Sequence, residues 1–218
     1  MRVSHALRFG AFVLCGLVAA CDPATMSLSG ASGAGAPSRA KVTVAGRPVV
    51  IAAPAGFCID APSTAATADG AFVLMSDCAL LGRSRGGRPP VGAALTASVS
   101  AGGLGGEGDD EAATLADLQH FLDTADGRAL VSRSGRGDRV RILSRQLKGD
   151  VLYVLVDDRG QQPIAGIDPR FWRAFLEVNG RMTVLSVIGF AGTGPGLQDS
   201  LNQLAATAAA IRAANPGA

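Results

Sequence analysis

The sequence predicts an α+β domain with a mainly antiparallel sheet flanked by two amphipathic helices. Short apolar stretches, separated by turn residues, follow one another in two series, before and after a helical segment. The links within each series are too short for the crossovers that parallel strands need, so neighbouring strands are expected to pair antiparallel. Two segments have helical spacing and a single apolar stripe, and such a stripe is buried against a sheet.

The first series of strands begins with a hairpin at residues 41–54, where Val42 and Val44 alternate with polar residues and Gly46 marks the turn. Further extended segments, bounded by turn residues, are expected at 56–60, 72–76 and 95–100. Two glycine-rich segments are predicted to be loops, one basic and one acidic, at 82–90 and 101–113.

Two segments are predicted to be helices. The first is expected to begin at Thr114, an N-cap with Asp117 three residues later, and to end at Gly127. The second covers residues 197–214 and ends at an Asn-Pro-Gly stop signal. Its apolar stripe is formed by Leu197, Leu201, Leu204, Ala208 and Ile211.

The second series of strands lies between the two helices. Asn179-Gly180 is the strongest turn signal in the chain and predicts a type I′ hairpin. Residues 148–150, Lys-Gly-Asp, form a second expected turn. The predicted strands of this series are 129–133, 140–146, 151–157, 171–178 and 182–190.

The N-terminus has the features of a secretory signal. Arg2 and Arg8 give it a positive start, and residues 9–20 carry no charge. This apolar segment is too short to span a bilayer comfortably, which takes about 20 residues. A short membrane anchor that is never cleaved is the alternative.

The residues Val18-Ala19-Ala20-Cys21 resemble the lipobox of bacterial lipoproteins. The resemblance implies that Cys21 receives a diacylglyceryl thioether, that the peptide is cut before it, and that the new amine is acylated. Two or more acyl chains give stable anchoring, so the chain is expected on the cell membrane, facing the periplasm. Asp22 resembles a retention signal for the inner membrane, and the choice between inner and outer membrane stays open.

These features divide the chain into three parts. Residues 1–20 form the signal peptide, 21–40 the lipidated cysteine with a flexible Ser/Gly/Ala/Pro-rich tether, and 41–215 a single α+β domain. The order of elements in this domain resembles the PsbP/Mog1-like α/β/α sandwich. That family includes several exported bacterial lipoproteins, but the resemblance implies a fold and not a function.

Two cysteines remain in the exported domain, Cys58 and Cys78. In an oxidising compartment they are expected to form a disulfide, with a buried free pair as the alternative. The mature chain keeps a single histidine, His120, so no metal site is expected and no cofactor is implied.

The charge pattern favours a local binding surface over general binding to polyanions. Without Arg2 and Arg8 the mature chain carries equal numbers of basic and acidic side chains, which argues against nucleic-acid binding. Five arginines nevertheless lie within residues 133–145, and Arg139 and Arg141 are expected on the outer face of a strand. Arginine suits carboxylate and phosphate contacts, so we expect these two to contact an envelope protein. Pairing with the acidic residues 107–111 is the alternative.

The catalytic signals are weak. Residues 82–86 match the G-x-S-x-G pattern of serine hydrolases around Ser84, but Gly-Arg-Pro-Pro follows and cannot begin the helix that this motif needs. Asp157 and Asp158 are adjacent carboxylates, a pattern that is more typical of a polar turn than of acid–base catalysis. We therefore expect a non-catalytic binding or accessory domain. The alternative is a cell-envelope hydrolase that uses Ser84 or the paired carboxylates.

Overall fold

A computed structural model describes residues 36–82, 92–105 and 111–217 of the chain. Cys21, the signal segment and most of the tether lie outside these residues. Within the described ranges, no helix combines the length and the apolar character that crossing a membrane requires.

The main element is a seven-stranded antiparallel sheet with the order β3-β4-β5-β9-β8-β7-β6. The two sequential series of strands join in its middle, where β5 pairs with β9. This arrangement confirms the predicted α+β class with a mainly antiparallel sheet. Its strands are β3 (Phe57–Ala66), β4 (Gly70–Asp77), β5 (Ala93–Ser100), β6 (Val140–Lys148), β7 (Val151–Asp158), β8 (Arg170–Val178) and β9 (Arg181–Gly189).

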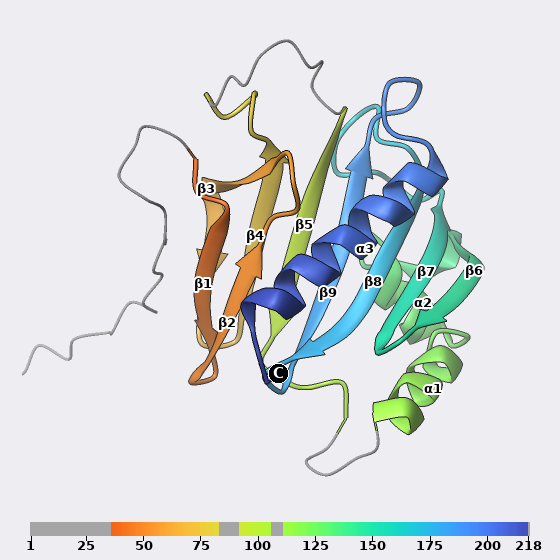
Figure 1. Cartoon of the computed structure of the whole chain (residues 1–218). Coiled ribbons are helices and arrows are strands. Elements are labelled where there is room, and N and C mark those ends of the chain that lie inside the picture. Colours follow the sequence, from red (N-terminus) through yellow and green to blue (C-terminus); the bar gives the residue numbers. More distant parts are fainter. Residues whose placement is uncertain (1–35, 83–91, 106–110, 218) are drawn as a thin grey trace, which may run out of the picture.

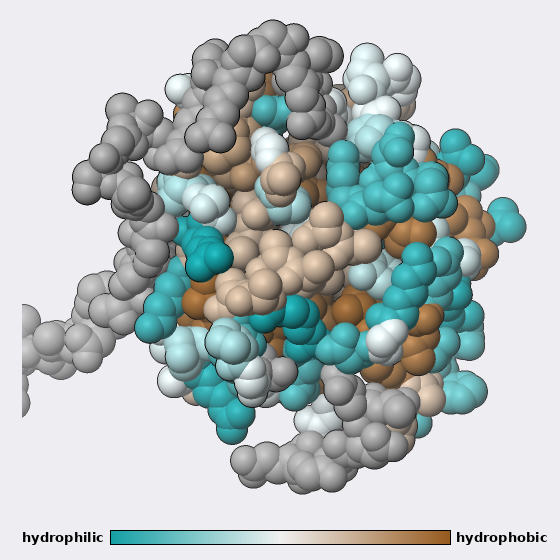
Figure 2. Space-filling model, viewed as in Figure 1, coloured by the Kyte–Doolittle hydropathy of each residue, from teal (hydrophilic) through white to brown (hydrophobic). Residues whose placement is uncertain are grey.

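One face of the sheet is covered by a hairpin and a long helix. The hairpin, β1 (Arg39–Val44) and β2 (Arg47–Ala52), packs over β3 and β4, and α3 (Leu197–Ala214) crosses β8 and β9 beside it (Figure 1). The larger core lies beneath them and includes Leu204 and Ile211 of the α3 stripe. The exposed side of α3 is rich in alanine, and Figure 2 shows it as a pale brown band.

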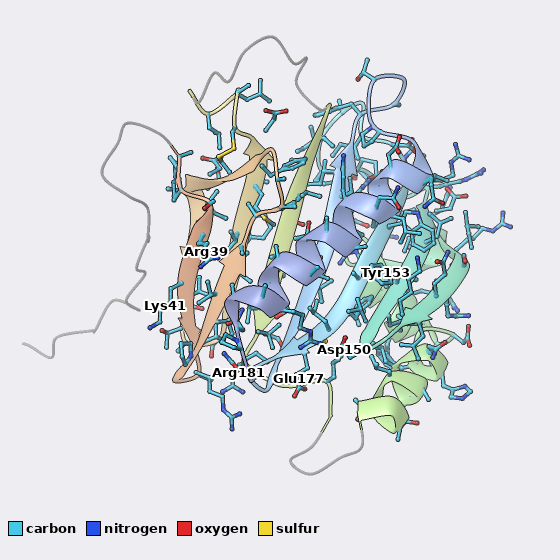
Figure 3. The ribbon with its side chains drawn as sticks, in the orientation of Figure 1. Arg39, Lys41, Asp150, Tyr153, Glu177 and Arg181 are labelled. Atoms are coloured by element: carbon cyan, nitrogen blue, oxygen red, sulfur yellow. A yellow bond between two sulfur atoms is a disulfide. The ribbon has the colours of Figure 1, made fainter. Side chains whose placement is uncertain are left out.

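The hairpin is fastened to the rest of the domain by polar side chains. Arg181 of β9 donates from Nη2 to the carbonyl of Ala45 (2.9 Å) and from Nε to that of Val44 (3.1 Å), and it lies at the hairpin's turn in Figure 3. At the end of α3, Asn215 Oδ1 accepts from the Val50 amide (2.9 Å), and its Nδ2 donates to the Val50 carbonyl (2.8 Å). Helix, hairpin and sheet therefore form one packed unit.

The opposite face carries two short helices. α1 (Glu111–Phe121) and α2 (Ala125–Val131) cover β6, β7 and β8, and Leu115, Leu122 and Val131 help to form a second, smaller core there. Figure 1 shows both helices behind that end of the sheet, while no described helix lies behind β3, β4 and β5.

The predicted strand at 129–133 is wrong, because its first three residues belong to α2. Thr124 caps this helix, accepting a hydrogen bond from the Gly127 amide at 3.0 Å. Gly127 does not end a helix but lies inside one, where a Cβ would be 2.0 Å from the carbonyl oxygen of Phe121. A short apolar run such as Ala129–Val131 has no period that separates strand from helix.

Other local predictions have clearer outcomes. Thr114 is not an N-cap, since α1 already begins at Glu111. Asn179 and Gly180 both have positive φ, 52° and 68°, as a type I′ turn requires. The disulfide between Cys58 and Cys78 is confirmed, with Cα atoms 4.9 Å apart.

Candidate functional site

A polar pocket of about 700 Å³ opens beside η1 (Gly137–Arg139) and the loop that follows β7. Three arginines line it, Arg136, Arg139 and Arg159, and Asp138 is the carboxylate among its described lining residues. We call it the arginine pocket. The rest of its lining consists of Ser134, Gly160, Gln161, Gln162 and Pro163.

Asp158 holds the two walls of the arginine pocket together. It ends β7 and is fully buried. Its Oδ2 accepts from the Arg133 amide (2.9 Å) and the Ser132 hydroxyl (3.0 Å), while its Oδ1 accepts from the Gly160 amide (3.0 Å). One carboxylate thus connects the segment after α2 with the loop after β7, and both loops contribute to the pocket lining.

The three pocket arginines differ in how far they are neutralised. Arg136 lies 3.5 Å from Asp138, and both side chains are largely exposed, so this pair is weak. Arg159 pairs at 3.0 Å with the buried carboxylate of Asp157. Arg139 has no ion pair with any described residue. The pocket therefore has an excess of positive charge.

The structure separates the two arginines that were expected to share a surface. Arg139 lines the arginine pocket, whereas Arg141 lies on β6 directly opposite Asp157 of β7 and does not line it. Arg170 of β8 is the other direct neighbour of Asp157. Residues 107–110, the expected acidic partners of this cluster, lie outside the described residues. That Arg139 and Arg141 contact a partner stays a prediction.

Arg133, another member of the sequence cluster, lies beneath the pocket. Its guanidinium carbon is 3.7 Å from the centre of the Phe171 ring, and its Nη1 donates to the Asp168 carbonyl (2.7 Å) and to Gln162 Oε1 (3.2 Å). Gln162 therefore connects Arg133 to the pocket wall. Burial, and then the nearby Arg173, lower the pKa of Arg133 to about 10, so it remains a cation at neutral pH.

Arg173 is a buried arginine next to Arg133 that the sequence did not single out. It lies on β8 between Phe171 and Phe175, on the same face of the strand. Burial lowers its pKa to about 10, and Asp158 acts in the opposite direction. The strand alternation could have indicated this buried position, because Arg173 lies two residues from both Phe171 and Phe175, which face inward.

The residues of the hydrolase alternative do not form a described site. Ser84 lies outside the described residues. His120 is exposed on α1. Asp157 and Asp158 are both buried and engaged in the contacts given above.

Metal binding has no candidate either within the described ranges, where no group of three His, Cys, Asp or Glu side chains could hold an ion.

Comparison with protein-family models, curated proteins and solved structures finds no match to this chain. Function is therefore inferred from the chain's own residues.

Proposed function

We propose that this chain is a lipid-anchored bacterial lipoprotein whose exported, non-catalytic domain binds an envelope protein through an acidic segment. The observation that carries the proposal is the arginine pocket, in which Asp138 and Asp157 pair with two of the three arginines and Arg139 has no ion pair with a described residue. Guanidinium groups bind carboxylates through paired, charge-assisted hydrogen bonds. The excess positive charge also steers an acidic partner toward the pocket, in a salt-dependent way.

The lipobox, the disulfide and the arrangement of the helices support this proposal. The lipobox resemblance supports a lipid on Cys21, about 20 residues before the start of the domain. The domain can therefore meet a partner that lies close to the membrane surface. The Cys58–Cys78 disulfide is stable in the oxidising compartment outside that membrane. Helices on both faces of the antiparallel sheet agree with the PsbP/Mog1-like resemblance.

The anchor is tested by metabolic labelling with a fatty-acid analogue. The wild-type chain is expected to incorporate the label, and a Cys21→Ser variant is expected to lose it, because the thiol that carries the lipid is gone. Equal labelling of the two chains would contradict the lipoprotein assignment. Separate fractionation of inner and outer membranes then decides which membrane holds the chain.

The pocket is tested by crosslinking in intact cells, followed by identification of the captured partner. Arg139→Glu is expected to reduce capture at least tenfold, since it places a negative charge in the pocket. Arg39→Glu is the matched control, because Arg39 is also an exposed arginine but lies on β1 (Figure 3) and does not line the pocket. Arg141→Glu shows whether the β6 surface contributes as well.

Two results would overturn this function. Equal capture by the Arg139→Glu and Arg39→Glu variants would remove the pocket from recognition. Hydrolysis of an envelope substrate that disappears with Ser84→Ala would replace the non-catalytic reading with the enzymatic alternative. Circular dichroism of both charge-reversal variants checks that each one is folded.

A further inference from the structure

A polar row crosses the sheet face that α1 and α2 cover in part. Arg173 of β8 lies directly opposite Ser186 of β9, which lies directly opposite Thr96 of β5. Side chains in such positions point to the same face, with Cβ atoms about 4.5–5.5 Å apart. The neighbouring rows are largely apolar, with Phe175 opposite Val184 on one side.

The guanidinium of Arg173 is only partly hydrogen-bonded within the described structure. Its Nε is buried and makes no hydrogen bond, and its Nη2 donates to the Ser132 carbonyl at 3.3 Å. It forms no ion pair with any described carboxylate. Buried donors are nearly always hydrogen-bonded in folded proteins, so this side chain points to a group that completes the site.

A second cation lies beside Arg173. The guanidinium carbons of Arg133 and Arg173 are 3.7 Å and 5.6 Å from the centre of the same Phe171 ring. Asp158 and Asp168 are the nearby acids, but neither forms an ion pair with these arginines. The carboxylate of Asp158 instead accepts from the Ser132 hydroxyl and from two backbone amides. No direct contact with a described carboxylate therefore neutralises the positive charge of these two guanidinium groups.

The two hydroxyls of the row are available as further donors. Ser186 and Thr96 are 8% and 7% exposed, and neither side chain is hydrogen-bonded to another residue in the described part of the chain. Ser186 is on β9 and Thr96 on β5, between β8, over which α1 and α2 pack, and β4, behind which no described helix lies (Figure 1). Phe72 of β4, on this same face, is 40% exposed.

We propose that Arg173, Ser186 and Thr96, with Arg133 beside them, form an oxyanion-binding site for a phosphate or carboxylate group. The two guanidinium groups supply charge, and the two hydroxyls supply hydrogen bonds on one side of the anion. This site is separate from the arginine pocket and does not depend on the proposed partner. The oxyanion is either a free ion or the headgroup of a ligand whose hydrocarbon part contacts Phe72 and Val184.

The test is a calorimetric titration of the purified full chain with inorganic phosphate and with butyl phosphate. Saturable binding of at least one probe is expected. Ser186→Ala and Thr96→Val should each weaken it by about tenfold, the effect of one charge-assisted hydrogen bond. Arg173→Gln should abolish it. Tighter binding of butyl phosphate identifies a headgroup, and equal binding of the two probes identifies a free ion.

The controls separate this site from the arginine pocket. Arg39→Gln, at an exposed arginine of β1 outside both sites, should leave phosphate binding unchanged. Binding that is lost in Arg139→Gln but kept in Ser186→Ala would place the phosphate in the arginine pocket and overturn the proposal. If Arg173→Gln does not fold, Ser186→Ala decides, because it removes one hydroxyl and leaves both arginines in place. The proposal is overturned if neither probe binds, or if binding persists unchanged in folded Arg173→Gln or in Ser186→Ala.

Discussion

Removing the disulfide is the perturbation whose size the structure sets most directly. The bond joins Cys58 of β3, which lies opposite Ser76 of β4, to Cys78 just beyond the end of β4. The amide of Cys78 also donates to the carbonyl of Gly56 at 3.0 Å. Because β-sheet pairing already holds these strands together in the folded state, the bond acts chiefly on the unfolded chain.

The expected loss follows from the length of the closed loop. The two cysteines are 20 positions apart, and the chain-entropy relation gives about 3 kcal/mol at 25 °C for such a loop. For a domain of this size, a loss of 1 kcal/mol lowers Tm by roughly 2–4 °C, so the full loss corresponds to roughly 6–12 °C. The Cys58→Ala/Cys78→Ala double variant should therefore remain folded at room temperature but melt clearly earlier.

Urea denaturation measures this difference. The double variant should show a lower midpoint than the oxidised wild type, and wild type with reductant should approach the variant. Adding reductant to the variant is the control and should change nothing. A midpoint equal to that of the oxidised wild type would refute the entropic reasoning, and so would alkylation of two thiols in the unfolded, unreduced wild type.

Three further predictions use other parts of the fold. Asn215→Ala should destabilise the domain by about 2 kcal/mol in urea denaturation, because it leaves the partly buried amide and carbonyl of Val50 without this partner. Unchanged stability would contradict this. Ala45→Asn should stabilise it by about 0.5–1 kcal/mol, since Ala45 has φ 46° and asparagine tolerates this left-handed conformation better; a lower Tm would contradict this. Burial raises the pKa of Tyr153, the single tyrosine, so its phenolate absorbance should appear above pH 10 in the folded protein and near pH 10 in urea. The stability that the buried, neutral phenol contributes is therefore complete below pH 10 and is lost as the pH rises above it.

Features that depend on a few neighbouring residues could be predicted from the sequence. The helix at Leu197–Ala214 has a long apolar stripe and a stop signal, and the structure gives it these same bounds. The Asn179-Gly180 turn follows from the ease with which these two residues adopt positive φ. The Cys58–Cys78 bond followed from the count of cysteines and the expected compartment, because the lipobox resemblance left no other pair.

Features that depend on distant residues could not be predicted in this way. The pairing of β5 with β9 joins residues 93–99 to 183–189, and no local signal specifies that partner. The helix α2 is seven residues long, and tertiary packing of Val131 stabilises it more than intrinsic propensity does. The arginine cluster was visible as composition, but its division between a pocket, a strand surface and a buried position depends on how the loops after α2 and β7 meet.

The adjacent aspartates show how the fold distributes charge that looks uniform in the sequence. Successive residues of a strand point to opposite faces, so the side chains of Asp157 and Asp158 lie on different faces of β7. Asp157 lies between Arg141 and Arg170 in the register and pairs with Arg159, whereas Asp158 is occupied by a hydroxyl and backbone amides. Both carboxylates therefore already have partners within the domain. Arg139 in the arginine pocket and Arg173 in the polar row have no ion pair with a described carboxylate, and these are the two places where we propose that an anion binds.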